Sequence, residues 1–208
     1  MGADSYRKQV EPVLYRLSTV FLRYNPDTLT VISFLLALLT AAVLILAGRI
    51  FPFYLIIIAF VTLFLSAFLD AMDGFVARRK NISSPYGDML DHTFDRYSDL
   101  ALITGFALSL QGDILLGLLA LGGVFMASYM GTQAQAVGLK RNYGGVLGRA
   151  DRLILMIIAI IIEAVYPFSY VFFIPITTIT ILLVWFAIGG HITAAIRFRK
   201  TVADMKAK

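Results

Sequence analysis

Long stretches without a charged residue constrain the fold of this chain more than any other feature. Residues 28–48, 50–69 and 114–139 contain no Asp, Glu, Lys or Arg. A helix needs about 20 predominantly apolar residues to cross a bilayer, so each stretch is long enough to do so. The chain is 59% apolar, whereas a soluble domain has about 45–50% apolar residues. We therefore predict an integral membrane protein.

Three further helices bring the predicted number of transmembrane helices to six. The predicted fold class is therefore all-α, in an integral membrane protein. The third helix covers residues 88–112, the fifth extends from residue 153 a little beyond residue 162, and the sixth covers residues 171–196. Pro167 separates the last two, because proline breaks a helix. Residues 26–200 are predicted to form the membrane domain, followed by a cytoplasmic tail at residues 201–208.

Residues 1–25 are predicted to form an amphipathic helix on the cytoplasmic surface of the membrane. Apolar residues recur at helical spacing among charged ones: Val10, Val13, Leu14, Leu17, Val20 and Phe21. Such a helix anchors a protein to the interface, and lining a path for lipid entry is the alternative role. The scattered charges and the lack of a compact apolar run argue against a signal peptide.

The positive charges gather at one end of the six predicted helices. All Lys and Arg residues except Arg49 fall at the end that carries both termini. The positive-inside rule then predicts that this end, with the aspartates described next, faces the cytoplasm. The net charge of +5 is thereby explained without nucleic acid as a partner. The chain has no cysteine, so disulfides are excluded.

Two pairs of aspartates stand at helical spacing near this end. Asp70 and Asp73 are three positions apart, and Asp91 and Asp95 are four apart, so each pair shares a helix face. Converging carboxylates repel one another and are costly beside a bilayer unless cations lie between them. Oxygen ligands favour Mg²⁺ or Mn²⁺, often with a substrate phosphate. A structural polar network or an ion path is the alternative.

The residues between the two pairs complete a recognisable pattern. The chain reads Asp-x2-Asp-Gly-x2-Ala-Arg-x8-Gly-x3-Asp-x3-Asp, at Asp70, Asp73, Gly74, Ala77, Arg78, Gly87, Asp91 and Asp95. This pattern resembles the signature of the CDP-alcohol phosphotransferases, whose plan of six spans behind a surface helix is also similar. The resemblance implies transfer of a phosphatidyl-type group from a CDP-linked lipid to an alcohol, with release of CMP, by a homodimeric membrane enzyme.

The resemblance also implies a role for each position of the pattern. Asp70, Asp73, Asp91 and Asp95 would hold metal ions, Mg²⁺ or Mn²⁺ and two in number, and Asp95 would also deprotonate the acceptor hydroxyl. The CDP-linked lipid would contact Asn25, Thr30, Asp70, Gly74, Ala77, Arg78 and Gly87. For the segment that begins at Asn25, an ordinary helix start capped by Asp27 or Thr28 is the alternative. Outside the pattern, Asp88 suits a helix N-terminus, and Asp99 is expected to support the site from behind, through Tyr129, Ser128 or a basic residue.

A second polar cluster indicates the acceptor. Arg149 and Arg152 share a helix face, and Arg197 ends the sixth span at the same level, so three guanidinium groups favour a phosphorylated alcohol. The segment from Thr132 and Gln135 to Arg152 resembles the inositol phosphate-type members, which implies myo-inositol 1-phosphate as acceptor and CDP-archaeol or CDP-diacylglycerol as donor. The predicted acceptor phosphate site comprises Thr132, Gln135, Arg149, Arg152 and Arg197. Lys140 and Arg141 are interpreted as membrane anchoring.

Other functions remain open at this stage. Glycerol 3-phosphate is the alternative acceptor within the same family, because it also carries a phosphate. A membrane prenyltransferase also uses aspartate-rich helices, but with two distant clusters and more spans. A cation transporter would distribute its acids through the midplane, usually in repeated halves. Small residues around Gly122 and Gly123 predict close helix packing, at a dimer contact or inside the protein.

Overall fold

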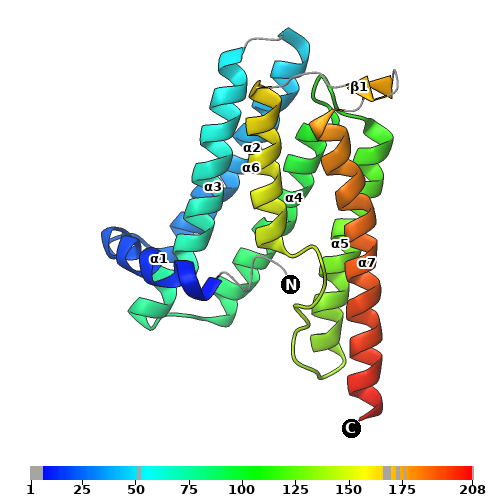
Figure 1. Cartoon of the computed structure of the whole chain (residues 1–208). Coiled ribbons are helices and arrows are strands. Elements are labelled where there is room, and N and C mark those ends of the chain that lie inside the picture. The colour runs from blue at the N-terminus through cyan, green and yellow to red at the C-terminus, as the bar shows by residue number, and fades with distance from the viewer. Residues whose placement is uncertain (1–6, 51–52, 166–169, 172–173, 176, 208) are drawn as a thin grey trace. The chain divides into compact units, whose positions relative to one another are not determined.

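Helices make up most of the chain that the structure describes. The structure is a computed structural model, and it describes residues 7–50, 53–165, 170–171, 174–175 and 177–207. Within these ranges it contains α1 (Arg7–Phe21), α2 (Pro26–Ile50), α3 (Phe53–Lys80), α4 (Pro85–Ala107), α5 (Ile114–Ala136), α6 (Arg149–Val165), α7 (Thr178–Lys206) and two short strands (Figure 1). The chain divides into two compact units, Ser5–Leu110 and Gln111–Lys208. The first unit contains α1 to α4, and the second contains α5 to α7.

Among the residues that the structure describes, four helices are long and apolar enough to cross a membrane. They are α2 over Pro26–Ala47, α3, α5 and α7. These helices support a multi-pass membrane protein, as the sequence predicts. Of the other predicted spans, α4 carries three aspartates and Arg96 in its first half, and α6 has 17 residues. Helix α4 is therefore too polar and α6 too short to count as a candidate span in the same way, and the number of six spans stays a prediction.

Several helix boundaries differ from the sequence prediction. Helix α4 ends at Ala107 rather than at residue 112. At this end, the Ser109 hydroxyl donates to the Phe106 carbonyl at 2.7 Å and closes the last turn. Helix α7 begins at Thr178 rather than at residue 171, because the Thr177 hydroxyl caps it by accepting the Thr180 N–H. The tail predicted from residue 201 is helical as far as Lys206. The break predicted at Pro167 lies outside the described residues.

The first span also begins earlier than predicted. Helix α2 starts at Pro26, a favourable first position because proline has no N–H to leave unpaired. The Asn25 side chain accepts the Asp27 N–H at 3.1 Å, and the Asn25 carbonyl accepts the Thr28 N–H at 3.1 Å. Asn25 therefore caps this helix, and the expectation that Asp27 or Thr28 does so is wrong.

The residues before the sixth span form a strand pair instead of a helix. Strand β1 (Tyr170–Val171) pairs antiparallel with β2 (Ile174–Pro175), with Tyr170 opposite Pro175 and Val171 opposite Ile174. β-branched residues favour strands, and Pro175 lacks the N–H that a continuing helix would use. The helix accordingly starts only after this pair.

Paired hydroxyl groups hold α2 against α3. The Thr40 hydroxyl donates to the Thr62 hydroxyl at 2.8 Å. Ser33 and Ser66 each donate to the other's backbone carbonyl, at 2.9 and 2.8 Å. Hydrogen bonds between helices are favourable where water is scarce and small polar residues permit close approach. They set the register of α2 against α3.

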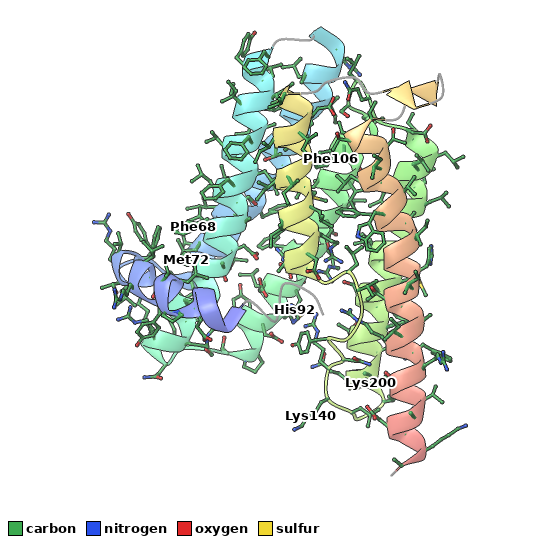
Figure 2. The ribbon with its side chains drawn as sticks, viewed as in Figure 1. Phe68, Met72, His92, Phe106, Lys140 and Lys200 are labelled. Atoms are coloured by element: carbon green, nitrogen blue, oxygen red, sulfur yellow. The ribbon has the colours of Figure 1, made fainter. Side chains whose placement is uncertain are left out.

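Helix α4 packs against the other side of α2. The Phe34 and Phe94 rings stack with their centroids 4.8 Å apart. Gly105 is pressed against α2, since a Cβ at this position would lie 2.7 Å from Ala41 Cα. Only glycine permits this separation, and Phe106 beside it is completely buried (Figure 2).

Helix α1 crosses the carboxy-terminal end of α3 (Figure 1). Leu14 and Phe21 pack against a buried cluster that α2 and α3 form around Met72. Phe68 meets the Phe21 ring edge-on, with the ring centres 5.7 Å apart (Figure 2). Val13, Leu17 and Val20 are exposed. The apolar side chains of α1 thus divide between those that contact α3 and those that do not.

In the second unit, α5 and α7 lie side by side at very short range (Figure 1). A Cβ on Gly123 would lie 2.7 Å from the Ala187 carbonyl oxygen, and one on Gly190 would lie 2.4 Å from the Gly123 carbonyl carbon. The sequence predicts close packing by small residues around Gly122 and Gly123. Gly123 indeed makes such a contact, between α5 and α7 inside this unit. Lys140 and Lys200 lie at the same end of the unit (Figure 2).

Candidate functional site

The connection between α3 and α4 sets one aspartate pair beside the other. Helix α3 ends at Asn81, which has a φ of 56°. Its N–H donates to the Arg78 carbonyl, and the Ile82 N–H donates to the Ala77 carbonyl, which is the Schellman pattern of a helix end. The Ser84 hydroxyl then caps α4 by accepting the Gly87 N–H at 3.1 Å. This short turn returns the chain so that α4 starts beside the end of α3.

Three carboxylates converge across this turn. Asp70, Asp73 and Asp91 each offer an oxygen, and these oxygens lie within 4.8 Å of one another. Asp73 is only 7% exposed, and Asp70 and Asp91 are half-buried. An all-oxygen donor set of this kind suits a hard divalent cation such as Mg²⁺ or Mn²⁺. The residues present therefore fit a metal ion.

Thr30 supports this group from α2. Its hydroxyl donates to Asp73 Oδ2 at 2.6 Å, and both side chains are buried. A hydrogen bond to a charged group is short and strong, so this bond orients the Asp73 carboxylate. Thr30 was expected to contact the nucleotide, and the structure places its hydroxyl on a predicted metal ligand.

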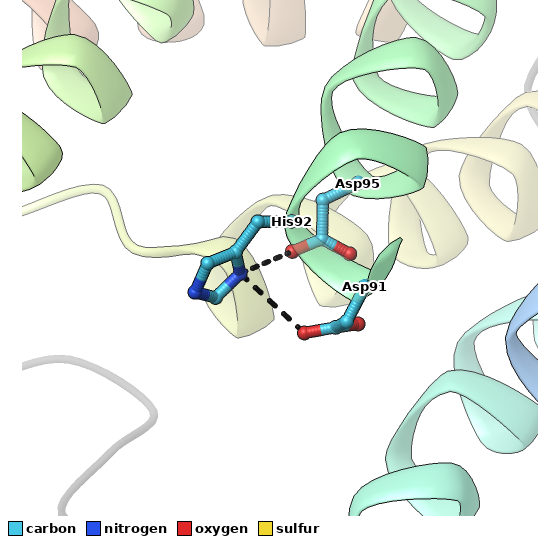
Figure 3. Close-up of side chains that lie close together, drawn as sticks. All are labelled: Asp91, His92 and Asp95. Atoms are coloured by element: carbon cyan, nitrogen blue, oxygen red, sulfur yellow. Dashed lines mark ion pairs between the residues drawn. The ribbon is translucent and has the colours of Figure 1, made fainter. Parts of the chain in front are cut away.

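A second acidic group lies on α4 alone. Atoms of Asp91, His92 and Asp95 that could bind a metal lie within 4.8 Å of one another. Figure 3 shows His92 Nδ1 between the two carboxylates, 3.5 Å from Asp91 Oδ2 and 4.0 Å from Asp95 Oδ2. His92 Nε2 is 3.3 Å from Asp88 Oδ1, one helical turn earlier. Asp88 lies in the first turn of α4, as predicted.

His92 is the residue that the sequence analysis did not identify. Adjacent residues do not share a helix face, so a histidine next to Asp91 is not expected to join an aspartate pair. The spacing of four between Asp88 and His92 is the signal in the sequence that could have identified it.

Arg96 links Asp95 to Asp99. Its Nη2 lies 3.7 Å from Asp95 Oδ2 and 3.3 Å from Asp99 Oδ2, and both carboxylates are buried. A buried carboxylate needs such a partner, because loss of hydration disfavours its charge. Arg96 is a basic residue, one of the three kinds of partner expected for Asp99, and the supporting role of Asp99 stays a prediction.

Arg78 folds back along α3. Its guanidinium carbon lies 4.8 Å from the centre of the Phe75 ring, and a Cβ on Gly74 would lie 3.2 Å from Arg78 Nη1. Gly74 thus leaves space that the Arg78 side chain uses. Ala77 is half-buried on the same helix, and a Cβ on Gly87 would meet only ordinary contacts, 3.5 Å or more away.

The predicted acceptor residues all lie in the second unit. Thr132 and Gln135 are exposed near the end of α5, and the Thr132 hydroxyl donates to the Tyr129 carbonyl at 3.0 Å. Arg149 begins α6 and is half-buried, and Arg152 follows one turn later and is buried. The Asp151 carboxylate accepts the Gly148 N–H at 2.8 Å, which is the return bond of a capping box.

Arg197 on α7 has a structural role that the sequence analysis did not predict. Its Nε donates to the Gly144 carbonyl and its Nη1 donates to the Ala127 carbonyl, each at 2.7 Å. Carbonyl groups accept hydrogen bonds but carry no net charge. These contacts therefore orient the guanidinium without cancelling its charge.

Comparison with known proteins identifies relatives across most of the chain. Residues 23–201 match the model of the CDP-alcohol phosphatidyltransferase family. The archaetidylinositol phosphate synthase of Pyrococcus horikoshii is 34% identical over 165 residues, which cover 76% of this chain and 82% of that protein.

Solved structures give the same fold. The phosphatidylinositol phosphate synthase of Mycobacterium tuberculosis with CDP-DAG bound superposes with a TM-score of 0.70 at 23% identity, covering 91% of this chain and 94% of that one. The complex of that synthase with manganese and citrate gives a TM-score of 0.72 at 23% identity, covering 90% and 88%. At this identity the likeness concerns the fold.

Proposed function

Because the chain belongs to the CDP-alcohol phosphatidyltransferase family, and is therefore a transferase of phospholipid biosynthesis, we propose a specific reaction for it. It transfers a phosphatidyl or archaetidyl group from CDP-diacylglycerol or CDP-archaeol to a hydroxyl of myo-inositol 1-phosphate and releases CMP. The observation that carries this proposal is the convergence of Asp70, Asp73 and Asp91 within 4.8 Å. The similarity to a protein named archaetidylinositol phosphate synthase supports the acceptor.

The aspartates would hold two divalent cations, Mg²⁺ or Mn²⁺, which would bind the diphosphate end of the donor. When bound, such ions neutralise charge on the attacking and leaving oxygens of an in-line displacement. Asp70, Asp73 and Asp91 supply oxygen ligands, and Asp95 shares in binding. Thr30 keeps Asp73 in place through its 2.6 Å hydrogen bond.

Asp95 is the general base of the proposed reaction. It accepts the proton of the acceptor hydroxyl, whose oxygen then attacks the lipid-side phosphorus of the donor while CMP leaves. Its carboxylate is 5% exposed, which limits competition from water. Arg96 and His92 contact it and hold its orientation.

The donor and acceptor contact different sets of residues. Arg78 binds the diphosphate of the donor, Gly74, Ala77 and Gly87 leave room for the nucleotide, and Asn25 shapes the cytidine end by capping α2. The acceptor phosphate is bound by Thr132, Gln135, Arg149, Arg152 and Arg197. Guanidinium groups suit this task because their paired donors match phosphate oxygens.

The proposal includes a membrane arrangement. Helices α4 and α6 complete six spans, both termini and the aspartates face the cytoplasm, and α1 lies in the membrane interface among lipid head groups. The exposed Val13, Leu17 and Val20 support the position of α1, since they form one apolar side. Two copies of the chain form a homodimer.

A direct assay tests the reaction. Purified protein receives Mg²⁺, a CDP-linked lipid and myo-inositol 1-phosphate, and CMP release is followed over time. Asp95→Asn is the inactive variant, and Asp204→Asn, an exposed aspartate near the end of α7, is its matched control. The expected result is acceptor-dependent release that Asp95→Asn abolishes and Asp204→Asn retains.

Each alternative outcome has a distinct meaning. Release with glycerol 3-phosphate, but not with myo-inositol 1-phosphate, would retain the family reaction and refute the acceptor. Full activity in Asp95→Asn would refute the assignment of the base. No release with either acceptor, in protein that binds the CDP-linked lipid, would refute the proposed transfer.

A further inference from the structure

The loop between α5 and α6 is fastened to α7 by a buried threonine. Thr193 is completely buried, and its hydroxyl oxygen accepts the N–H groups of Val146 at 3.1 Å and Leu147 at 3.0 Å. Hydrogen-bonding groups that are buried in a loop must find such partners, because leaving them unpaired is costly. Thr193 therefore fixes the last residues of the loop before α6.

Asn142 fastens the first part of the same loop. Its side-chain Nδ2 donates to the Arg197 carbonyl at 3.1 Å, and its Oδ1 accepts the Gly144 N–H at 3.0 Å. Asn142 is 6% exposed. Arg197 Nε also donates to the Gly144 carbonyl. Both the first and the second half of the loop are therefore bonded to α7.

The backbone of the loop is shaped for this contact. Gly145 has a φ of +126°, and a Cβ there would lie 2.3 Å from Thr193 Cγ2. Both the backbone conformation and the lack of space demand glycine. The loop can therefore approach Thr193 closely enough for its hydroxyl to reach two consecutive N–H groups.

The fastened loop leads directly into the start of α6. Gly148 follows Leu147, its N–H is held by the Asp151 carboxylate at 2.8 Å, and its carbonyl accepts the Arg152 N–H at 3.2 Å. A continuous series of bonds thus runs from Thr193 on α7 to the first turn of α6, which carries Arg149 and Arg152.

We propose that Thr193 and Asn142 are positioning residues for the phosphorylated acceptor. By holding the loop against α7, they fix the first turn of α6 and so the direction of its two arginines. This inference rests on the acceptor site of the proposed function. It assigns to the loop a selective effect, on the acceptor and not on the CDP-linked lipid, whose proposed contacts come from α2, α3 and α4.

Thr193→Val provides the test, because it keeps the shape of the side chain and removes the oxygen that accepts both bonds. Thr201→Val is the matched control on the same helix, since Thr201 Oγ1 is buried and has no hydrogen-bond partner among the described residues. Thr193→Ser is the conservative variant that retains the oxygen. Amide hydrogen exchange of Val146 and Leu147 and separate KM values for the two substrates are measured in each protein.

The expected result has two parts. Exchange at Val146 and Leu147 becomes faster in Thr193→Val only. The KM for myo-inositol 1-phosphate rises about tenfold, because small misplacement of binding groups is costly, while the KM for the CDP-linked lipid stays unchanged. Thr193→Ser and Thr201→Val behave like the wild-type protein.

Contrary outcomes are distinguishable. Faster exchange with an unchanged acceptor KM, or an equal rise of both KM values, would overturn this inference alone. So would unchanged exchange in Thr193→Val. Absence of acceptor-dependent CMP release in the wild-type protein would instead refute the proposed function, and this inference with it.

Discussion

In the unit Ser5–Leu110, contacts between side chains hold the candidate site, whereas in the unit Gln111–Lys208 side chains of α7 hold the backbone of a loop. In the first unit, Thr30 donates to Asp73, and Arg96 lies between Asp95 and Asp99. In the second, Thr193 accepts two backbone N–H groups. The first arrangement keeps charged groups in place on rigid helices, and the second gives a fixed shape to a segment without regular structure.

This difference shows why the two regions respond differently to sequence change. A helix presents side chains at fixed spacing, so the identity of a few residues specifies the acidic groups. A loop has no such periodicity, and its shape depends on whichever groups satisfy its backbone. Substitutions in the acidic groups are therefore expected to affect the chemistry directly, whereas substitutions that loosen the loop are expected to act through its shape.

Besides the loss of activity expected for Asp95→Asn, the largest effect is expected at Asp91, which belongs to both acidic groups. Asp91→Asn should lower CMP release by about a thousandfold, because loss of metal-based charge stabilisation is worth several kcal/mol. Chelation of divalent ions should abolish release in the wild-type protein, and added Mg²⁺ or Mn²⁺ should restore it. The Asp204→Asn control should remain active. An Asp91→Asn enzyme with wild-type turnover at low Mg²⁺ would contradict the metal assignment.

The next effect concerns the loop in the second unit. Gly145→Ala should destabilise the protein by about 2–4 kcal/mol, because it combines an unfavourable backbone conformation with a clash against Thr193. Gly138→Ala is the matched control, with φ of +77° but open space around a Cβ, and should cost about 1 kcal/mol. Thermal unfolding in detergent measures both. Equal losses would show that the contact with Thr193 does not matter.

A smaller effect is expected where α2 supports the acidic group. Thr30→Val removes a buried hydrogen bond to a carboxylate and should cost about 1.5–3 kcal/mol. It should also raise the metal concentration that gives half-maximal CMP release. Thr40→Val removes a bond between the same two helices, to Thr62, and should cost about 1 kcal/mol without altering the metal requirement. If both variants alter it equally, Thr30 acts only through helix packing.

The smallest effect is expected where α1 meets α3. Arg79 Nη1 lies within hydrogen-bond distance of the Tyr15 carbonyl and the hydroxyls of Ser18 and Thr19, at 3.0, 3.2 and 2.8 Å. Arg79→Ala should cost about 1 kcal/mol, since the contact is partly exposed. It should make α1 easier to cleave in limited proteolysis. Arg23→Ala, which removes a contact with the Tyr24 ring, is the control, and equal cleavage of both variants would refute the role of Arg79.

Much of the first unit could be predicted because its information is local. The spacing of Asp70 from Asp73, and of Asp91 from Asp95, follows from the helical repeat, and the structure brings Asp70, Asp73 and Asp91 together. The uncharged stretches likewise predict α2, α3 and α5 as candidate spans. The helix ends were less predictable. Several neighbouring polar residues could cap each helix, and capping by Asn25 or Thr177 depends on which of these residues adopts an extended backbone.

The sequence by itself determined the membrane class of the protein, most of its helices and the identity of its acidic groups, since hydrophobic length and helical spacing are properties of neighbouring residues. Only the tertiary structure decided that Thr30 supports Asp73, 43 positions away, and that Thr193 holds Val146 and Leu147, 47 and 46 positions away. The family resemblance singles out Thr30 but not its bond to Asp73, and no local pattern distinguishes Thr193 from other threonines in apolar helices. Both roles arise because helix packing leaves buried polar groups that these hydroxyls satisfy.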